Sequence, residues 1–153
     1  MGKMDDLRIR QLDEALATFD PVRRRPPPPT GWARAIREAL GMSLRQMSRR
    51  TGLSKTSIGS AEAGEVKGTV QFNTLQRLAD ALDCDLVYAL VPRSSLGRTL
   101  EAQAERKAAQ LVGRVADSME LEAQGVPDQE TERQVREMIP ALLRDRGRDF
   151  WDV

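Results

Sequence analysis

The residues best suited to chemistry in this chain are polar and cationic side chains within residues 43–64, SLRQMSRRTGLSKTSIGSAEAG. The pattern predicts a helix, a three-residue break and a second helix, because Gly52 can take the positive φ of a tight turn and Ser54 can cap the second helix. Leu53 and Ile58 are the expected buried anchors of the turn. The outward face of the second helix then carries side chains that are small, flexible or able to hydrogen-bond, namely Lys55, Thr56, Ser57, Gly59 and Ser60. Such a face fits the major groove of DNA, which is about 12 Å wide.

The composition excludes several kinds of site. The 153 residues include no histidine and a single cysteine, Cys84, so the chain cannot form a four-ligand zinc site or a catalytic centre that requires histidine. One cysteine also excludes a disulfide framework, which favours a reducing cytoplasm. Cys84 follows an acidic residue at a helix end, and this position favours a structural thiol over a reactive one. We therefore expect a protein that is not an enzyme and that needs no cofactor and no metal ion.

Charge is unevenly distributed along the chain, although the net charge is only +1. Residues 1–60 carry six more basic than acidic side chains, whereas residues 61–93 and 94–153 have net charges of −2 and −3. A polyanion is therefore expected to bind the first part of the chain. The longest apolar run, residues 86–91, is far shorter than the roughly 20 residues that span a bilayer, and residues 1–10 lack the apolar stretch of a signal peptide. These features predict a soluble, cytoplasmic protein with no membrane partner.

The periodicity of apolar residues predicts a mainly α fold made of several parts. An amphipathic helix is expected within residues 1–20, and the sequence RRRPPPPT within residues 21–30 predicts a stiff polyproline linker. A ligand for a proline-recognition domain is the alternative for this linker. Residues 31–85 contain four short helical patterns separated by glycines, which predicts a compact bundle of four to five helices.

Individual residues set the expected bounds of these short helices. Ser43 can cap the second helix, and Gly41, Gly52 and Gly64 are expected to end the first three. Asn73 is the expected cap of the fourth helix. One face of the first helix is expected to hold Trp32, Ile36, Ala39 and Leu40, and the buried stripe of the fourth Leu75, Leu78, Ala79 and Leu82.

Residues 86–92, LVYALVP, predict a short strand after the bundle, because they are rich in β-branched and aromatic side chains. The sequence offers no second strand to pair with it. The strand is therefore expected to pair with its own copy in a second subunit, and a continuation of the preceding helix is the alternative. The residues expected to form this dimer strand are Leu86, Val87, Tyr88, Ala89 and Leu90.

Residues 94–153 predict a long helical C-terminal extension. Apolar residues recur every three to four positions up to residue 121, and the sequence Gly-Val-Pro at residues 125–127 is expected to break the helix. A final helix comes after this break, and Pro140 is expected to kink or divide it. The terminal Phe150 and Trp151 are expected to pack back onto this region.

Residues 43–64 resemble the helix-turn-helix of the XRE and phage-repressor family in both residue types and spacing. The family pattern has a small residue, then Gly-apolar-Ser, then Ile, then Glu-x-Gly, and it is matched here by Ser48, Gly52, Leu53, Ser54, Ile58, Glu62 and Gly64. The resemblance covers residues 32–83, about a third of the chain. Two positions depart from the pattern. Leu44 replaces a usual Gln, which puts one phosphate or base contact in doubt, and Ser48 replaces a usual Ala.

The resemblance implies a set of residues that contact DNA. The base-reading positions fall on Lys55, Thr56 and Ser60, and positions that contact a base or the backbone fall on Ser57 and Gly59. The implied phosphate contacts are Ser43, Arg45, Lys67, Asn73 and Thr74. A merely solvated helix face is the alternative for these polar side chains.

The layout after the motif is similar to that of HipB-type antitoxins, in which a strand after the bundle joins its dimer mate. The whole chain resembles more closely the mobile mystery protein A family, through residues 31–43, 81–93 and 123–127. That resemblance implies a homodimeric autorepressor of a palindromic or pseudo-palindromic operator, and a neighbouring Fic-domain protein as partner. An antitoxin that restrains this partner is the alternative function. Direct inhibition of a Fic active site is weakly supported, because SAEAGE at residues 60–65 has the wrong spacing for the inhibitory signature.

Overall fold

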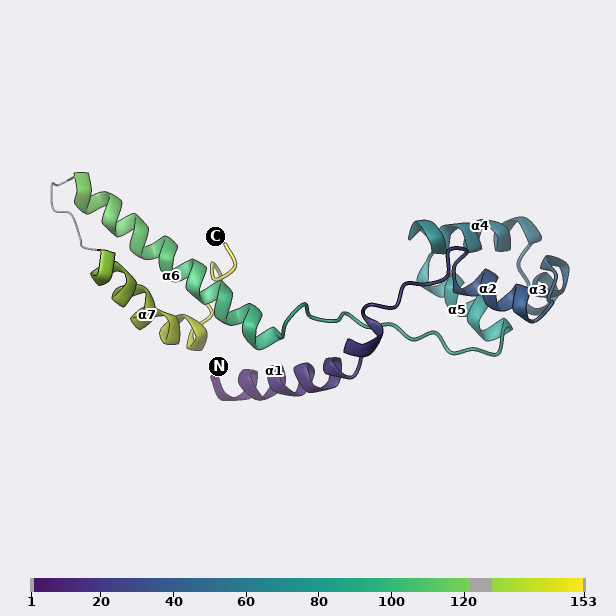
Figure 1. Ribbon diagram of the computed structural model, residues 1–153, viewed down its shortest axis with the longest axis horizontal. Helices are drawn as coiled ribbons and strands as arrows, with labels where there is room; N and C mark the ends of the chain where they lie inside the picture. Colours follow the sequence, from purple (N-terminus) through teal and green to yellow (C-terminus); the bar gives the residue numbers. More distant parts are fainter. Residues whose placement is uncertain (1, 122–127, 153) are drawn as a thin grey trace. The chain divides into compact units, whose positions relative to one another are not determined.

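The computed structural model describes residues 2–121 and 128–152, and every regular element within them is a helix. The chain divides into two compact units (Figure 1). The central unit is Pro21–Ala89, and the terminal unit joins Met1–Asp20 to Leu90–Val153. The helices are α1 (Gly2–Ala17), the 3-10 helix η1 (Asp20–Val22), α2 (Trp32–Ala39), α3 (Leu44–Thr51), α4 (Lys55–Lys67), α5 (Phe72–Ala81), α6 (Leu96–Leu121) and α7 (Asp128–Arg144). No helix in the described part is both long enough and apolar enough to cross a membrane.

All four helices of the central unit contribute to one small core. Met47 of α3, Ile58 of α4 and Leu78 of α5 are fully buried, and Ala33 of α2 packs with them. Burial of each large apolar side chain contributes about 1.5–3 kcal/mol, so these contacts dominate the packing of such short helices. Leu53 is half-buried against the same core, which confirms the prediction that Leu53 and Ile58 anchor the turn between α3 and α4.

Of the predicted apolar face of α2, only Ile36 packs against the core. Trp32 and Leu40 are 55% and 59% exposed, whereas Ala33 and Arg37 are buried. The apolar pattern misleads here because Arg37 points inward, where it forms an ion pair with Glu62 of α4. A paired charge can therefore take a core-facing position that the sequence alone assigns to an apolar side chain.

The predicted end of α4 at Gly64 was wrong. The helix continues to Lys67, and Gly68, with φ +71°, ends it. Gly64 lies inside the helix, where an added Cβ would come within 3.2 Å of the backbone nitrogen of Val70. Glycine at this position therefore leaves room for the chain that turns back after α4, and a Cβ would require the backbone of Val70 to shift by a few tenths of an ångström.

The predicted start of α5 was also wrong. The helix begins at Phe72, one residue before the expected cap Asn73, and its N-cap residue Gln71 makes no side-chain capping hydrogen bond. The ring of Phe72 packs edge-on against that of Tyr88, with centroids 4.9 Å apart. The helix thus begins without a side-chain cap, and its first residue contacts a ring that lies beyond the end of the helix.

The predicted strand at residues 86–91 is not formed in the single chain. A strand needs a neighbouring backbone, and no described segment supplies one. The alternative, a continuation of the preceding helix, is not formed either, because α5 ends at Ala81. Val87, Tyr88 and Leu90 are 70%, 71% and 83% exposed. Pairing of this segment with a second subunit stays a prediction.

The terminal unit is a helical hairpin, in which α6 and α7 lie side by side and α1 packs against α6 (Figure 1). The buried face of α6 combines small apolar side chains, among them Ala104 and Ala108, with two buried polar ones, Gln103 and Lys107. The largest buried side chain of this unit is Phe150, only 2% exposed, which comes from the turn that ends the chain. Gln103 of α6 donates a hydrogen bond of 2.8 Å from Nε2 to the carbonyl oxygen of Phe150. The prediction that Phe150 packs back onto this region is confirmed.

Polar contacts hold the middle and the start of α6. In the middle, Lys107 Nζ lies 3.2 Å from Asp149 Oδ2 and donates to the carbonyl oxygen of Asp152 at 3.1 Å. At the start, the carboxylate of Asp13 of α1 accepts hydrogen bonds from the backbone nitrogens of Leu96 at 2.7 Å and Gly97 at 3.2 Å. Asp13 thus caps α6 from another helix.

The remaining predictions for the terminal unit concern α7 and the segment before it. The expected break at residues 125–127 lies outside the described residues. Helix α7 runs through Pro140 and is not divided there, contrary to one of the two expected outcomes.

Candidate nucleic-acid interface

Ser43 begins α3 with a reciprocal capping box. Its Oγ accepts from the backbone nitrogen of Gln46 at 3.2 Å, and Gln46 Oε1 accepts from the backbone nitrogen of Ser43 at 2.8 Å. The predicted cap is therefore confirmed. Leu44, which stands where the resembled family has a glutamine, is half-buried and packs against the core. Gln46, the third residue of the helix, is exposed, and its side-chain oxygen is engaged in the cap.

Side chains from α3 and α5 hold the turn between the two motif helices. Gly52 has the predicted positive φ, +72°, and donates to the carbonyl oxygen of Ser48 at 2.9 Å. Ser48 Oγ donates to the carbonyl oxygen of Leu53 at 2.6 Å, and Thr51 Oγ1 accepts from the nitrogen of Leu53 at 3.1 Å. Arg77 Nη2 donates to the carbonyl oxygen of Thr51 at 2.7 Å. The departure from alanine at Ser48 therefore adds a hydrogen bond that holds the turn.

Ser54 caps α4 as predicted, and Ser57 takes part in the cap. Ser54 Oγ accepts from the backbone nitrogen of Ser57 at 3.0 Å and lies 2.8 Å from Ser57 Oγ. Both hydroxyls are thus engaged at the start of the helix. A contact of Ser57 with DNA would have to share a hydroxyl that already hydrogen-bonds to the cap.

The three predicted base-reading residues lie together on one free face of α4. Lys55, Thr56 and Ser60 are exposed, and none of their side chains makes a hydrogen bond or ion pair within the described residues. Gly59 lies between them on the same face, and a Cβ built there would have no neighbour within 4 Å. Positions 55, 56, 59 and 60 share a face because helical residues three and four apart are neighbours. No side chain protrudes from this face at Gly59, and side chains that can donate hydrogen bonds lie on either side of it.

The predicted phosphate-contacting residues are more widely spread. Arg45 is exposed on α3, and Lys67 is exposed at the last residue of α4, about 18 Å along the helix from Lys55. Asn73 and Thr74 lie in the first turn of α5, where Thr74 Oγ1 lies 3.4 Å from Asn73 Oδ1. The structure therefore brings the base-reading residues together but distributes the phosphate-contacting ones over three helices.

Sequence reasoning missed the buried ion pair between α2 and α4. Arg37 Nε donates to Glu62 Oε1 at 2.6 Å and Nη2 donates to Glu62 Oε2 at 3.0 Å, while Nη1 reaches the carbonyl oxygen of Met42 at 2.9 Å. The hydrogen bond with Glu62 raises the pKa of Arg37, so the guanidinium stays charged. Glu62 was recognised as part of the motif, but its partner lies 25 positions earlier and no local pattern marks it.

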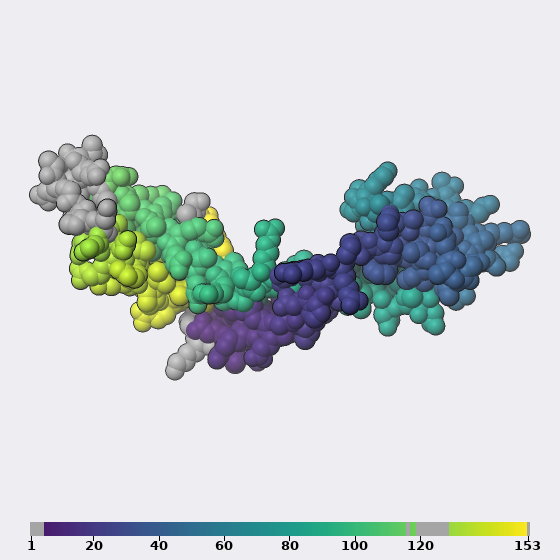
Figure 2. Space-filling model, viewed as in Figure 1, coloured from purple at the N-terminus to yellow at the C-terminus, as the bar shows by residue number. Residues whose placement is uncertain are grey.

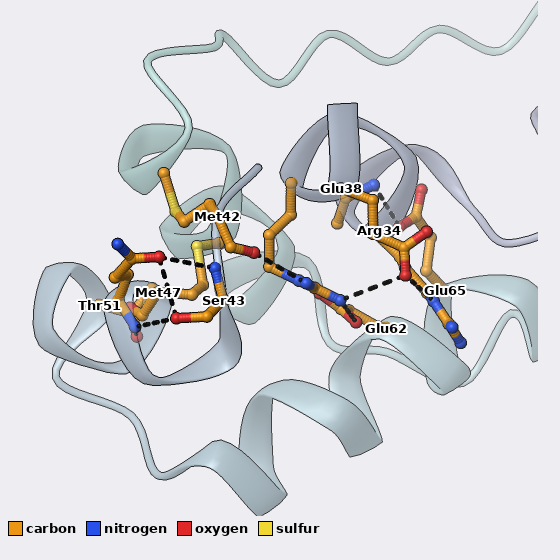
Figure 3. A network of polar contacts seen from close by, with 11 residues as sticks. Arg34, Glu38, Met42, Ser43, Met47, Thr51, Glu62 and Glu65 are labelled. Atoms are coloured by element: carbon orange, nitrogen blue, oxygen red, sulfur yellow. Dashed lines mark hydrogen bonds and ion pairs between the residues drawn. The ribbon is translucent and has the colours of Figure 1, made fainter. Parts of the chain in front are cut away.

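A second carboxylate of α4, that of Glu65, holds the start of α2. Its oxygens accept from the backbone nitrogens of Trp32 at 2.7 Å and Ala33 at 2.9 Å. Figure 3 shows Glu65 in the same polar network as Glu62. These amides would otherwise have no partner at the helix start. Glu62 and Glu65 are three residues apart, so the inner face of α4 fixes α2 with two acidic side chains while the opposite face stays free.

Residues 34–88 match a family model described as helix-turn-helix. This segment is an XRE-type helix-turn-helix domain. Its motif helices are α3 and α4, and α4 is the recognition helix, the second helix of the motif, which such domains place in the major groove of DNA. The domain therefore belongs to a DNA-binding, regulatory class rather than a catalytic one. No curated protein and no solved structure matches the chain.

Proposed function

We propose that this protein is a sequence-specific transcriptional regulator that binds its own upstream DNA as a homodimer and represses its own operon. The observation that carries the proposal is the free outer face of the recognition helix, on which Lys55, Thr56 and Ser60 are exposed and unengaged. Lys55 can donate to guanine O6 or N7, and Thr56 can contact a thymine methyl group or a phosphate. Ser43, Arg45 and Lys67 are proposed to position the domain on phosphates.

The dimer is proposed to form through residues 86–90, at the end of the domain. The exposed side chains of Val87, Tyr88 and Leu90 lie on a segment with no backbone partner among the described residues of the single chain. Antiparallel pairing with the same segment of a second subunit would satisfy these backbone groups and cover the apolar side chains. Two recognition helices would then read half-sites about 34 Å apart on a palindromic or pseudo-palindromic operator.

The test is binding of the purified protein to its own upstream DNA and to a scrambled duplex at two salt concentrations. We expect a preference of about 10³-fold or more for the upstream DNA, with protection of paired half-sites. Equal, strongly salt-dependent binding to both duplexes would contradict sequence-specific regulation. Repression is then tested with a reporter gene behind the same upstream DNA.

Two variants test the assignment of residues. Lys55→Ala is expected to cost about 1–3 kcal/mol of binding and to relax specificity at one base position. Lys67→Ala is expected to weaken binding to all sequences alike and to lower the salt slope by about 1. Arg136→Ala, which removes an exposed charge from α7, is the matched control and is expected to leave both quantities unchanged. An unchanged affinity in Lys55→Ala would show that the reading face lies elsewhere.

A second candidate function, restraint of a neighbouring Fic-domain protein, would belong to the terminal unit. That unit is compact in its own right, and residues 94–153 have a net charge of −3, unsuited to DNA. Deletion of residues 94–153 discriminates between the two functions. A regulator without such a partner keeps its operator binding, whereas an antitoxin loses its complex with the Fic-domain protein. The closer resemblance to mobile mystery protein A stays a prediction.

A further inference from the structure

We infer that Arg24 and Arg25 form a basic arm that enters the minor groove of DNA beside the half-site bound by the recognition helix. The inference rests on the proposed DNA binding by α4, and it adds a second contact region that the helix-turn-helix motif does not include. The arm consists of these two arginines and the proline run at residues 26–29. It belongs to the central unit (Figure 2).

The charges of the arm are not used by the fold. Arg24 and Arg25 are exposed, and their side chains make no hydrogen bond or ion pair within the described part of the chain. Arg23 precedes them, so three guanidinium groups follow one another in the sequence. Adjacent like charges repel one another, and a polyanion relieves this repulsion. Arg24 and Arg25 therefore carry positive charge suited to binding DNA, and no ion pair within the described residues neutralises it.

The root of the arm is fixed to the recognition helix. The backbone nitrogen of Gly31 donates to the carbonyl oxygen of Pro28 at 2.9 Å, which closes a turn between the proline run and α2. Gly31 has φ +80°, and a Cβ at this position would lie 2.9 Å from an oxygen of Glu65. The same carboxylate holds the first amides of α2. The chain therefore leaves the bundle from a point tied to α4 by Glu65.

The point where the arm joins the bundle lies beside the exposed face of α4. Pro29 and Thr30 line a groove of about 470 Å³ together with Gly59, Ala63 and Lys67 of α4. These three residues follow Lys55 at intervals of four and so continue the face on which the base-reading side chains lie. DNA seated on this face would pass beside the root of the arm.

The proline run gives the arm its reach and its stiffness. Polyproline chains extend about 3.1 Å per residue, so Arg25 stands about 9 Å from Pro28. A stiff arm loses little conformational freedom when it binds, because proline has already restricted its backbone. Arginine side chains are attracted to the negative potential of a narrow minor groove, which is strongest in A·T-rich DNA. The geometry and chemistry of the arm therefore favour a flanking minor groove.

The test compares the full-length protein with the double variant Arg24→Ala/Arg25→Ala on two duplexes. Both duplexes contain the same footprinted half-sites from the upstream DNA, but one has A·T-rich and the other G·C-rich flanks. The double variant is expected to bind the A·T-flanked duplex about tenfold more weakly and to lose much less affinity on the G·C-flanked one. Its salt slope should fall by about 1–2, and its footprint should shorten at the flanks.

The matched control is Arg98→Ala/Arg136→Ala, which removes the same charge from exposed positions of the terminal unit. It is expected to change affinity less than about twofold. Equal losses on both flanks would overturn the minor-groove placement, and an unchanged affinity of the arm variant would overturn the inference. If the wild type binds the half-sites, and Lys55→Ala weakens this binding while the arm variant does not, the inference about the arm is wrong and the proposed function stands. If the wild type shows no sequence preference, the proposed function itself fails.

Discussion

In the central unit, four short helices bury one small core with an ion pair at its edge. In the terminal unit, the buried face of the long helix α6 combines alanines with the polar side chains of Gln103 and Lys107, and the large buried side chain comes from the end of the chain. The central contacts join neighbouring helices of one continuous segment. In the terminal unit Asp13 reaches Leu96 and Gln103 reaches Phe150 across 83 and 47 positions. A compact motif is thus stabilised within itself, while a helical hairpin depends on residues from both chain ends.

The two tryptophans make this comparison measurable. Trp32 lies in the central unit and Trp151 in the terminal unit, and both are more than half exposed. The variants Trp32→Phe and Trp151→Phe therefore give proteins in which fluorescence reports on one unit at a time. Substitutions made in these two backgrounds show which unit each contact stabilises.

The largest effect is expected from Glu62→Ala, because it leaves the buried guanidinium of Arg37 without its carboxylate. Removing one partner of a buried pair costs about 3–5 kcal/mol of unfolding free energy, and we expect about 4 kcal/mol here. Urea unfolding followed by Trp32 fluorescence, in the Trp151→Phe background, measures it. Glu38→Ala, which breaks the exposed pair with Arg34 and a longer contact of 3.8 Å with Arg37, is the comparison and should cause a much smaller loss. A loss no larger than that of Glu38→Ala would show that the ion pair does not hold α2 to α4.

Phe150→Ala should produce the next largest loss, in the terminal unit. Truncation of a buried phenylalanine costs about 3–5 kcal/mol, and the lower end is expected because the chain end can relax into the space. Hydrogen exchange of the α6 amides measures the loss. Trp151→Ala, at the exposed neighbour whose ring packs edge-on against Phe150, is expected to cost less. An equal loss in the central unit, seen through Trp32, would mean that the two units unfold together.

Asp13→Ala tests the cap that α1 supplies to α6. Loss of a capping side chain costs about 0.5–2 kcal/mol, so about 1 kcal/mol is expected, confined to the terminal unit. Faster hydrogen exchange at the first amides of α6 is the expected signature. Glu14→Ala, at the adjacent exposed position of α1, should leave these amides as protected as in the wild type. If Asp13→Ala leaves the protection of these amides unchanged, solvent rather than Asp13 satisfies them.

The smallest effect is a pH dependence of the C-terminal turn. The hydrogen bond from Lys107 lowers the pKa of Asp149 below its ordinary value. Its stabilising contribution is complete above the ordinary pKa and is lost as the pH falls through the lowered value, from about pH 4 downward. Trp151 fluorescence in the Trp32→Phe background should report this loss, and Asp149→Asn should remove it. An acid transition that persists unchanged in Asp149→Asn would have another origin.

The features that the sequence predicted correctly are those set by neighbouring residues. Ser43, Gly52 and Ser54 were assigned as caps and turn because each acts on amides within three or four positions. Ile58 was assigned to the core from its place in the motif. The candidate reading face resulted from the same local spacing, which is why Lys55 and its neighbours lie on one exposed side of α4.

The features that it missed depend on contacts between distant segments. Gly64 signals a helix end locally, but the close approach of Val70 gives it another role inside α4. The inward position of Arg37 requires Glu62, 25 positions away, and Phe72, the first residue of α5, contacts the ring of Tyr88 beyond the end of that helix. A predicted strand at residues 86–91 needs a second backbone that the described part of the single chain does not supply. Periodicity describes one helix at a time and holds no information on such partners.

The division of α4 into an inner face that holds α2 and an outer face free of contacts has a consequence for evolution. Glu62 and Glu65 fix the frame of the domain, while Lys55, Thr56 and Ser60 make no contact among the described residues that stability requires. Substitutions at these outer positions are therefore expected to leave the fold stable and, if DNA binds this face as proposed, to change the preferred target without compensation elsewhere in the fold. A duplicated copy of this gene can diverge in its target through single, individually viable steps.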